Sequence, residues 1–374
     1  MPASKLKILI TGGGTGGHVY PGLAIAKEIK ALRPDAEILF VGSPRGIEQK
    51  VVPREGFPIE FVDVRYFVRK LSMQNLRTVL IAARAYLKAK KIIRRFQPAV
   101  VVGTGGYVSG PVVLAATKAK IPTLIQEQNA FPGLTTRLLA ARVDKVAVSH
   151  KDAVKRIAKN ATVVITGHPV RGQFFNVSRR EGRENLQIKS KQRLVLVVGG
   201  SGGAEKLNQV ILSAAERLLA NPQVRIIHVT GKRYYQWACA ELAKLGLPTE
   251  TAERYQLVDF LHDIPFAMAA SDLVISRSGG MIHEVAAVGR PALYIPSPNV
   301  TDDHQLHNAR SMADAGAAIL IEEKQLNADI LYSEVSSLLT DDSRLESMAA
   351  NSKKLGKPGA GQRIAKLVLE LANK

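Results

Sequence analysis

The sequence predicts an α/β fold with two Rossmann-like domains, each built around a parallel β-sheet. An apolar run at residues 7–11 leads into a glycine-rich block and then a helical pattern, and the same order returns at residues 194–220. After each of these starts, short apolar runs alternate with helical patterns, which is typical of parallel sheets covered by helices. The chain has 374 residues, enough for two domains of this kind.

The first half predicts seven strands separated by helices or glycine-rich loops. Strands are expected at residues 7–11, 38–42, 59–62, 99–103, 122–126, 145–149 and 162–166. Helices are expected at residues 18–31, 44–55, 75–96, 110–119, 132–141 and 151–159. Because ligands of such sheets bind beyond the carboxyl ends of the strands, the loops at those ends are the first candidates for a site.

The second half predicts a second sheet and a final helix. Strands are expected at residues 194–198, 225–229, 255–258, 272–276, 291–296 and 317–321. Helices lie between them, for example at residues 204–220 and 280–288, and the tail at 360–373 has an amphipathic pattern. We place the N-terminal domain at residues 1–171, a polar linker at 172–192 and the C-terminal domain at 193–359.

Composition limits the class of protein. Cys239 is the only cysteine, which excludes a disulfide within the chain, and no apolar run is long enough to span a bilayer. The N-terminus shows no signal-peptide pattern, so a cytoplasmic location is the simplest expectation. The net charge of +20 favours an anionic partner: nucleic acid, an anionic membrane or a phosphorylated substrate.

The positive charge is concentrated where acids are missing. Residues 64–126 contain no Asp or Glu, and within them residues 65–96 alternate basic with apolar side chains. This region has three interpretations: a solvated helix face, a nucleic-acid surface without any recognised binding motif, or a patch for anionic lipid headgroups. The lipid interpretation fits best, because apolar anchors mixed with Lys and Arg favour an anionic membrane surface.

The first glycine block fits a phosphate loop better than a dinucleotide site. Gly12, Gly14 and Gly17 satisfy G-x-G-x-x-G between a strand and a helix. An NAD site would need an acid at the end of the second strand, but that strand runs into Gly42 and Ser43. What remains is a set of backbone N–H groups and a helix dipole, which favour phosphate, or a tight turn without a ligand.

The second half holds a more specific group of residues after its fourth strand. Ser278 is a predicted N-cap, and Gly279 and Gly280 let an anion approach the N–H groups of the helix that follows. Glu284, one turn in, can accept from ribose hydroxyls or simply stabilise the helix dipole. The pair His304 and His307 lacks a third metal ligand, so we expect no metal site.

These motifs together resemble the MurG family, the UDP-N-acetylglucosamine:N-acetylmuramyl-(pentapeptide) pyrophosphoryl-undecaprenol N-acetylglucosamine transferases of glycosyltransferase family 28. The resemblance runs in the family's order from residue 12 to about residue 316. It is carried by Gly13–His18, Gly105–Pro111, Gln126–Asn129, Gly167–Arg171, Gly199–Ala204, Arg277–Glu284, and Gln305 with Asn308 and Ala309.

The resemblance implies a GT-B fold, in which two Rossmann-like domains face a cleft. It also implies an inverting hexosyltransferase that moves N-acetylglucosamine from UDP-N-acetylglucosamine to lipid I (undecaprenyl-diphospho-N-acetylmuramoyl-pentapeptide), giving lipid II for peptidoglycan, cell shape and division. It places the protein at the cytoplasmic face of the cell membrane as a peripheral protein and the final helix, 360–374, back on the first domain. Other cell-wall and division enzymes become candidate partners, and nucleic acid does not.

The resemblance also implies a role for each matching residue. Glu284 would hold the uridine ribose, Ile264 the uracil through its backbone, and Gln305 the sugar hydroxyls. The donor diphosphate would be held by Ser201 and by the helix start Ser278, Gly279, Gly280 and Met281. Positions linked to the donor sugar and the cleft are Thr15, Gly16, Gly17, Asn129 and Arg171. The acceptor's diphosphate would be held by the loops of Gly13, Gly14, Gly105, Gly106 and Tyr107.

Inverting transfer needs a base for the proton of the acceptor hydroxyl and stabilisation of the leaving UDP. The candidate base is His18, which could instead only order its loop or bind phosphate, and Glu127 is the rival base. The sequence has no Asp-x-Asp signature, so it requires no metal and no other cofactor. The alternatives are a related GT-B enzyme acting on diacylglycerol or another lipid, a UDP-sugar epimerase, and a non-catalytic nucleotide-binding protein.

Overall fold

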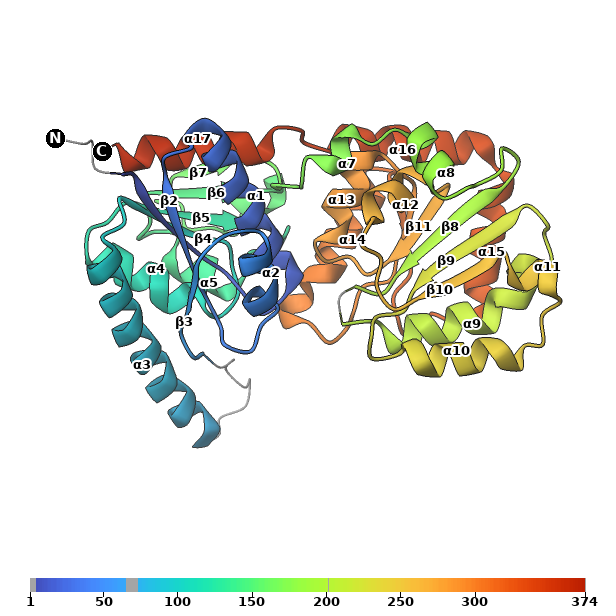
Figure 1. Cartoon of the computed structure of the whole chain (residues 1–374), viewed down its shortest axis with the longest axis horizontal. Coiled ribbons are helices and arrows are strands. Elements are labelled where there is room, and N and C mark those ends of the chain that lie inside the picture. The colour runs from blue at the N-terminus through green and yellow to red at the C-terminus, as the bar shows by residue number, and fades with distance from the viewer. Residues whose placement is uncertain (1–4, 65–72, 201, 374) are drawn as a thin grey trace. The chain divides into compact units, whose positions relative to one another are not determined.

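The computed structural model describes residues 5–64, 73–200 and 202–373. The chain forms two compact units, Met1–Arg171 with Gly359–Lys374 and Gly172–Pro358, which we call unit 1 and unit 2 (Figure 1). Each unit contains one β-sheet in which every pair of neighbouring strands is parallel. No helix in the described part of the chain is both long and apolar enough to cross a membrane.

Unit 1 contains a seven-stranded sheet in the order β3-β2-β1-β4-β5-β6-β7. Its strands are β1 (Lys7–Thr11), β2 (Glu37–Gly42), β3 (Ile59–Phe61), β4 (Val100–Gly103), β5 (Thr123–Glu127), β6 (Lys145–Val148) and β7 (Val163–Ile165). Its helices are α1 (Gly16–Leu32), α2 (Glu48–Arg54), α3 (Met73–Phe96), α4 (Ser109–Lys118), α5 (Leu134–Leu139), α6 (Lys151–Val154) and α17 (Ala360–Ala372).

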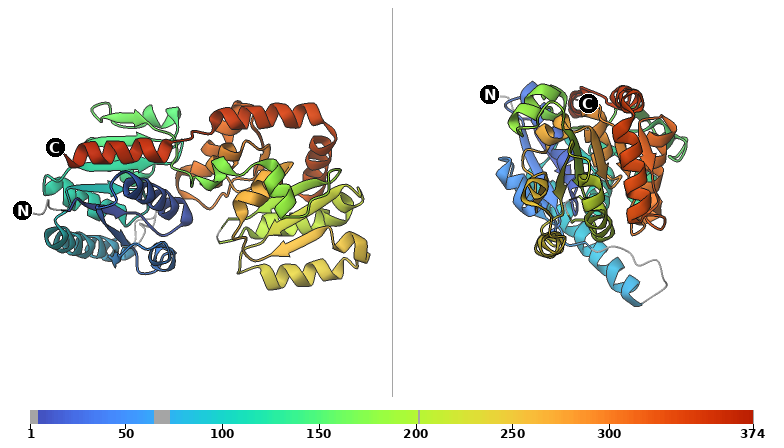
Figure 2. Two further views of the ribbon diagram at one scale, coloured as in Figure 1. Left: turned by 45° about the horizontal axis from the view of Figure 1, so that its top comes forward. Right: turned by 90° about the vertical axis from the view of Figure 1, so that its right-hand side faces the viewer.

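Helices cover both faces of this sheet because its strands are apolar on both sides. Ile8 and Ile10 of β1 pack with α1 and α17 on one face, and Leu9 packs with α3 and α4 on the other. Helix α17, red in Figure 2, is the end of the chain, yet it lies along unit 1 beside α1. Its apolar stripe is buried there, and Arg363 donates from Nε and Nη2 to the Thr166 carbonyl at 3.1 and 2.8 Å.

Unit 2 contains a six-stranded sheet in the order β10-β9-β8-β11-β12-β13. Its strands are β8 (Arg193–Val198), β9 (Val224–Val229), β10 (Tyr255–Val258), β11 (Leu273–Ser276), β12 (Ala292–Tyr294) and β13 (Ala318–Leu320). Its helices are α7 (Gln173–Asn176), α8 (Arg179–Asn185), α9 (Glu205–Leu219), α10 (Tyr235–Lys244), α11 (Thr249–Ala252), α12 (Ile264–Ala270), α13 (Met281–Val288), α14 (His304–Asp314), α15 (Ala328–Thr340) and α16 (Asp342–Leu355), with a short 3₁₀ turn at Thr301–Asp303. Every strand that the sequence predicts is present, with ends that differ by no more than two residues.

The predicted linker at residues 172–192 is wrong. This segment forms α7 and α8 and belongs to unit 2, where Phe174 is buried and Gly182 packs against the backbone of α12. Its charged composition misleads because Arg179 and Arg183 pair with Asp272, whose carboxylate is almost fully buried. A polar segment that pairs its charges with a buried acid is part of a fold and not a solvent-exposed connection.

Both sheets reverse their strand order at one place, between β1 and β4 in unit 1 and between β8 and β11 in unit 2. Ligands of open parallel sheets bind outside the carboxyl ends of the strands at this switch point. The glycine loops after β1 and β4, and those after β8 and β11, lie at the two switch points. The fold therefore places the glycine motifs where each unit is suited to bind a ligand.

Candidate functional site

In unit 1 the loops after β1 and β4 are joined into one surface. The Thr104 N–H donates to the Thr11 carbonyl at 2.8 Å, and its hydroxyl donates to the His18 carbonyl at 2.8 Å. Gly106 has φ +79°, and a Cβ there would overlap the Gly13 carbonyl oxygen. Only glycine permits this close approach, so the two glycine motifs are needed together.

His18 is the partly exposed residue between these loops. Its Nδ1 lies 3.1 Å from the Thr15 hydroxyl, which orients the imidazole. The ring lies against Gly105, where a Cβ would be 2.5 Å from the ring carbon Cδ2. The two glycine loops therefore hold an oriented histidine at the carboxyl end of β1, as a general base requires.

Glu127 is buried, and the loop that follows it supplies donors to its carboxylate. It is 4% exposed, and each carboxylate oxygen already accepts hydrogen bonds. Oε1 accepts from the N–H and the side-chain amide of Asn129 at 2.9 and 3.2 Å, and Oε2 accepts from the Gly133 N–H at 2.9 Å and the Thr136 hydroxyl at 2.6 Å. Burial raises the pKa of this carboxyl, and the hydrogen bonds oppose the rise. The structure favours a role in which Glu127 shapes the loop after β5 and orients Asn129.

The predicted donor-side residues of unit 1 lie beside the same surface. The Arg171 guanidinium stacks on the Tyr20 ring, 5.2 Å from its centre. That ring packs on Gly16, where a Cβ would lie 3.1 Å from Cε2. A Cβ on Gly17 would lie 3.7 Å from the Gln128 amide, next to Asn129. Unit 1 thus groups Thr15, Gly16, Gly17 and Arg171 with the loop after β5, and Tyr107 is 41% exposed on the neighbouring loop.

In unit 2 the prediction that Ser278 caps α13 is wrong. The N-cap is Gly280, and Ser278 is fully buried two residues earlier. Its hydroxyl donates to the Gln305 carbonyl at 2.7 Å, and its own carbonyl accepts from the Asn308 side chain at 3.1 Å. Ser278 therefore ties the turn after β11 to the first turns of α14, and its hydroxyl is already used.

The residues around that turn remain suited to a nucleotide sugar. Gly279, Gly280 and Met281 are partly exposed at the start of α13, where the first N–H groups have no partner within the helix. Glu284 lies in the first turn and is partly exposed. Gln305 uses Oε1 to accept from the Ser297 N–H at 2.9 Å, which turns its amide nitrogen toward Gly279.

Ile264 and Ser201 are the remaining predicted donor residues of unit 2. Ile264 is the first residue of α12 and is partly exposed, so its N–H belongs to the open end of that helix. Ser201, predicted at the donor diphosphate, lies outside the residues that the structure describes. The described part of this glycine loop packs closely against the backbone after β9, because a Cβ on Gly203 would overlap the Thr230 carbonyl.

The buried His228 stabilises the backbone against which that loop packs, through Asn208. His228 contacts Asn208 Oδ1 through Nε2 at 3.0 Å and the Tyr255 hydroxyl through Nδ1 at 2.8 Å. Asn208 in turn donates to the Thr230 carbonyl at 3.1 Å. Burial lowers the pKa of His228 to about 3, so the imidazole is neutral at physiological pH.

Sequence reasoning missed two residues that position these loops. Arg277 donates from Nη1 to the Ile295 and Pro296 carbonyls at 3.0 and 3.3 Å and pairs with Glu323 through Nη2, which fixes the end of β12. Glu48 accepts from the N–H of Gly14, so that N–H is not open to a diphosphate as predicted. Neither contact has a local sequence signal, because each joins distant parts of the chain.

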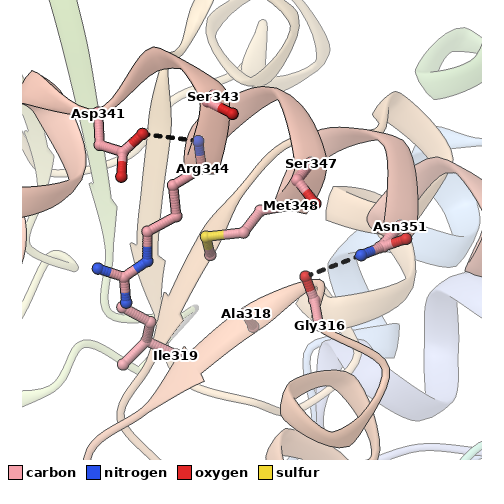
Figure 3. Close-up of a pocket in the computed structure, with 9 residues that line it drawn as sticks. All are labelled: Gly316, Ala318, Ile319, Asp341, Ser343, Arg344, Ser347, Met348 and Asn351. Atoms are coloured by element: carbon pink, nitrogen blue, oxygen red, sulfur yellow. Dashed lines mark hydrogen bonds between the residues drawn. The ribbon is translucent and has the colours of Figure 1, made fainter.

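A cavity of about 450 Å³ lies elsewhere in unit 2, between β13 and α16 (Figure 3). Its polar groups serve the fold: Asp341 accepts from the Arg344 N–H at 2.9 Å, and Asn351 donates to the Gly316 carbonyl at 3.3 Å. It also lies at the amino end of β13, away from the glycine loops. Among the described residues, no group of three or more His, Cys, Asp or Glu side chains is arranged to hold a metal ion.

Comparison with known proteins agrees with this arrangement. Residues 8–148 match the glycosyltransferase family 28 N-terminal domain, and residues 194–364 match its C-terminal domain. The UDP-N-acetylglucosamine–N-acetylmuramyl-(pentapeptide) pyrophosphoryl-undecaprenol N-acetylglucosamine transferase of Acetivibrio thermocellus is 43% identical over 98% of both chains. The chain belongs to the MurG family.

Other matches extend this result. The enzyme with the same name from Caldanaerobacter subterraneus is also 43% identical, over 97% of this chain and 99% of its own. The crystal structure of Acinetobacter baumannii MurG is 28% identical, covers 98% of this chain and 99% of its own, and superposes with a TM-score of 0.77. A UDP-GlcNAc 2-epimerase from Neisseria meningitidis has a TM-score of 0.68 at 15% identity, which shows a shared fold alone.

Proposed function

We propose that this protein transfers N-acetylglucosamine from UDP-N-acetylglucosamine to lipid I and so forms lipid II. The observation that carries the proposal is the identity of 43% over almost the whole chain with a protein of that name. The site supports it independently, because unit 1 presents an oriented histidine and unit 2 presents a helix start beside a carboxylate and an amide. An epimerase is not favoured, since that likeness extends only to the fold.

The donor is assigned to unit 2. The N–H groups at Gly279–Met281 and the α13 dipole stabilise the diphosphate, and they also stabilise the charge that develops when UDP leaves. Glu284 accepts from the ribose hydroxyls, and the Gln305 amide nitrogen donates to hydroxyls of the sugar. The reaction needs no redox chemistry, and we propose that it proceeds without a metal or another cofactor.

The acceptor is assigned to unit 1. His18 removes the proton from the attacking hydroxyl of the acceptor sugar as that oxygen bonds to the anomeric carbon and the bond to UDP breaks, which inverts the configuration. The loop of Gly105, Gly106 and Tyr107 faces the acceptor's diphosphate, and Arg171 adds positive charge on this unit. Glu127 only shapes the loop of Asn129.

We also infer that the protein binds an anionic membrane surface, where a lipid-linked acceptor resides. Residues 65–72 of the predicted patch lie outside the described residues, but the later part of α3 is described. Leu80 and Leu87 are 56% and 58% exposed, and the exposed Arg84, Lys88 and Lys91 share their helical stripe. Two leucines among cations form an amphipathic surface for anionic headgroups.

The membrane proposal is tested by sedimentation with vesicles. Binding should rise with the anionic lipid fraction and weaken with salt. The double variant L80E/L87E should lose binding, whereas I330E, which changes an exposed apolar residue of unit 2, should keep it. Equal binding of all three proteins to neutral vesicles at high salt would overturn the proposal.

The acceptor is tested with a panel of lipids and labelled UDP-N-acetylglucosamine. We expect label in the lipid fraction with lipid I and none above background with diacylglycerol or without an acceptor. Transfer to diacylglycerol at a comparable rate would instead identify a related lipid glycosyltransferase. Release of a 2-epimeric sugar without any acceptor would identify an epimerase.

A further inference from the structure

Glu48 is a fully buried carboxylate beside the first glycine loop. Its two oxygens accept from the Gly14 N–H at 3.0 and 3.2 Å, and Oε1 also accepts from the Ser43 N–H at 2.8 Å. No Lys, Arg or His in the described part of the chain pairs with it. A buried carboxylate needs such N–H donors, and here one of them, from Gly14, belongs to the loop that precedes His18.

The surrounding backbone is shaped to admit this carboxylate. Gly13, Gly42 and Gly46 all face it, and a Cβ on any of them would overlap or crowd the Glu48 side chain. The three glycines come from the loop after β1, the end of β2 and the turn before α2. Because glycines from three separate segments leave room for it, the carboxylate has a specific position and is not buried by accident.

The carboxylate occupies the place that a phosphate oxygen would take in an open glycine loop, because it accepts the N–H that such a loop offers to an anion. Unit 2 differs at the equivalent point. Gly200 has the same φ as Gly14, +88°, but no carboxylate of the described residues accepts from its N–H. The segment after the second strand of that sheet carries Lys232 and Arg233 and no acid.

We propose that Glu48 is a positioning residue that locks the first glycine loop so that the loop holds His18 and does not take a phosphate. The link is short: Glu48 holds the Gly14 N–H, the next residue is Thr15, and the Thr15 hydroxyl orients the His18 ring. The proposal rests on the proposed function, with His18 as the base. It explains why two similar glycine loops serve different purposes.

The first test is the variant E48A in the full-length protein. Loss of the carboxylate frees the loop, and we expect kcat for transfer to lipid I to fall about 100-fold, the effect of a displacement near 1 Å in a catalytic group. The dissociation constant for UDP should stay within about twofold, because the nucleotide is assigned to unit 2. D144A is the matched control: Asp144 accepts from the Thr123 N–H at 2.8 Å at the opposite end of the sheet. It should keep the wild-type kcat.

The second test separates positioning from stability. If Glu48 acts through His18, adding E48A to H18A leaves the kcat of H18A unchanged, whereas a merely structural role gives a further loss. If E48A folds poorly, G46A provides a second variant. The Cβ at position 46 would displace the carboxylate while Glu48 remains, so G46A should lower kcat as E48A does. Wild-type kcat in E48A or G46A, or additive losses with H18A, would overturn the inference. A wild-type protein that does not use lipid I would instead overturn the proposed function.

Discussion

One pair of substitutions tests the proposal that His18 is the base and that Glu127 only shapes the loop after β5. The variant E127Q keeps the size of the side chain but replaces one of two acceptor oxygens with an NH₂ donor. Oε1 now serves Asn129 and Oε2 serves Gly133 and Thr136, so the amide can satisfy only one side. Whichever way it turns, one backbone N–H that now bonds the buried carboxylate, of Asn129 or of Gly133, faces a donor.

The magnitude follows from that single lost acceptor. A buried N–H without an acceptor costs about 1–3 kcal/mol, so we expect the free energy of unfolding to fall by about 2 kcal/mol. For a unit of this size that corresponds to a decrease of about 4–8 °C in Tm. Below its Tm, E127Q should keep most of the wild-type transfer activity, because Glu127 does not accept the proton of the acceptor hydroxyl.

The assay combines calorimetry, amide hydrogen exchange and transfer kinetics on the same samples. E127Q should lower Tm and speed exchange in the segment 128–139, with kcat reduced by less than about tenfold. H18A should show the reverse: an unchanged Tm and a loss of about 100-fold or more in kcat, as loss of a general base produces. An E127Q protein with the wild-type Tm, and with kcat as low as that of H18A, would refute the assignment.

Other predictions follow from the buried contacts. The pKa of His228 falls from 6.5 to about 3 on folding, so the unfolded chain binds an extra proton within that window and stability falls as the pH is lowered through it. By pH 5 the loss is about 2 kcal/mol, and acid unfolding of H228Q should be less steep; an identical slope would exclude this cause. R363A removes two hydrogen bonds to Thr166 and should destabilise the protein by about 1–2 kcal/mol in urea unfolding, and no change would mean that α17 is held by its apolar stripe alone. S278A frees the Gln305 carbonyl and should raise KM for UDP-N-acetylglucosamine about tenfold with a smaller change in kcat, whereas a loss confined to kcat would contradict donor binding there. Transfer should survive EDTA, and a strict requirement for a divalent cation would contradict the proposed leaving-group stabilisation.

The sheets could be predicted from sequence because their signal is local. Runs such as Lys7–Thr11 and Arg193–Val198 are apolar on both faces and are followed by glycine, which fits a strand covered by helices on both sides. Each run is short enough to be recognised without knowing its neighbours. The prediction for the region 172–192 failed for the opposite reason, because Arg179 and Arg183 are paired with Asp272, about 90 residues later in the chain.

The sequence predicts which loops form the site but not which partners the side chains of those loops contact. Glycine motifs after predicted strands indicated the candidate loops, because the α/β pattern places such loops at the carboxyl ends of a parallel sheet. The switch points follow only from the strand order in the structure. The use of each side chain depended on distant partners. Ser278 follows a strand and precedes a helix, as an N-cap does, yet its hydroxyl bonds to Gln305. Glu127 is the rival base by sequence, yet the loop that follows it supplies donors to both oxygens.

The proposed function is tested most directly by identifying the product that the purified protein forms from UDP-N-acetylglucosamine and lipid I. The proposed reaction gives a lipid whose mass is that of lipid I plus one N-acetylhexosamine residue, with an inverted, β-configured linkage and one UDP released per lipid. H18A should form the same product far more slowly. A retained α linkage, or UDP release without any gain in lipid mass, would exclude inverting transfer to lipid I.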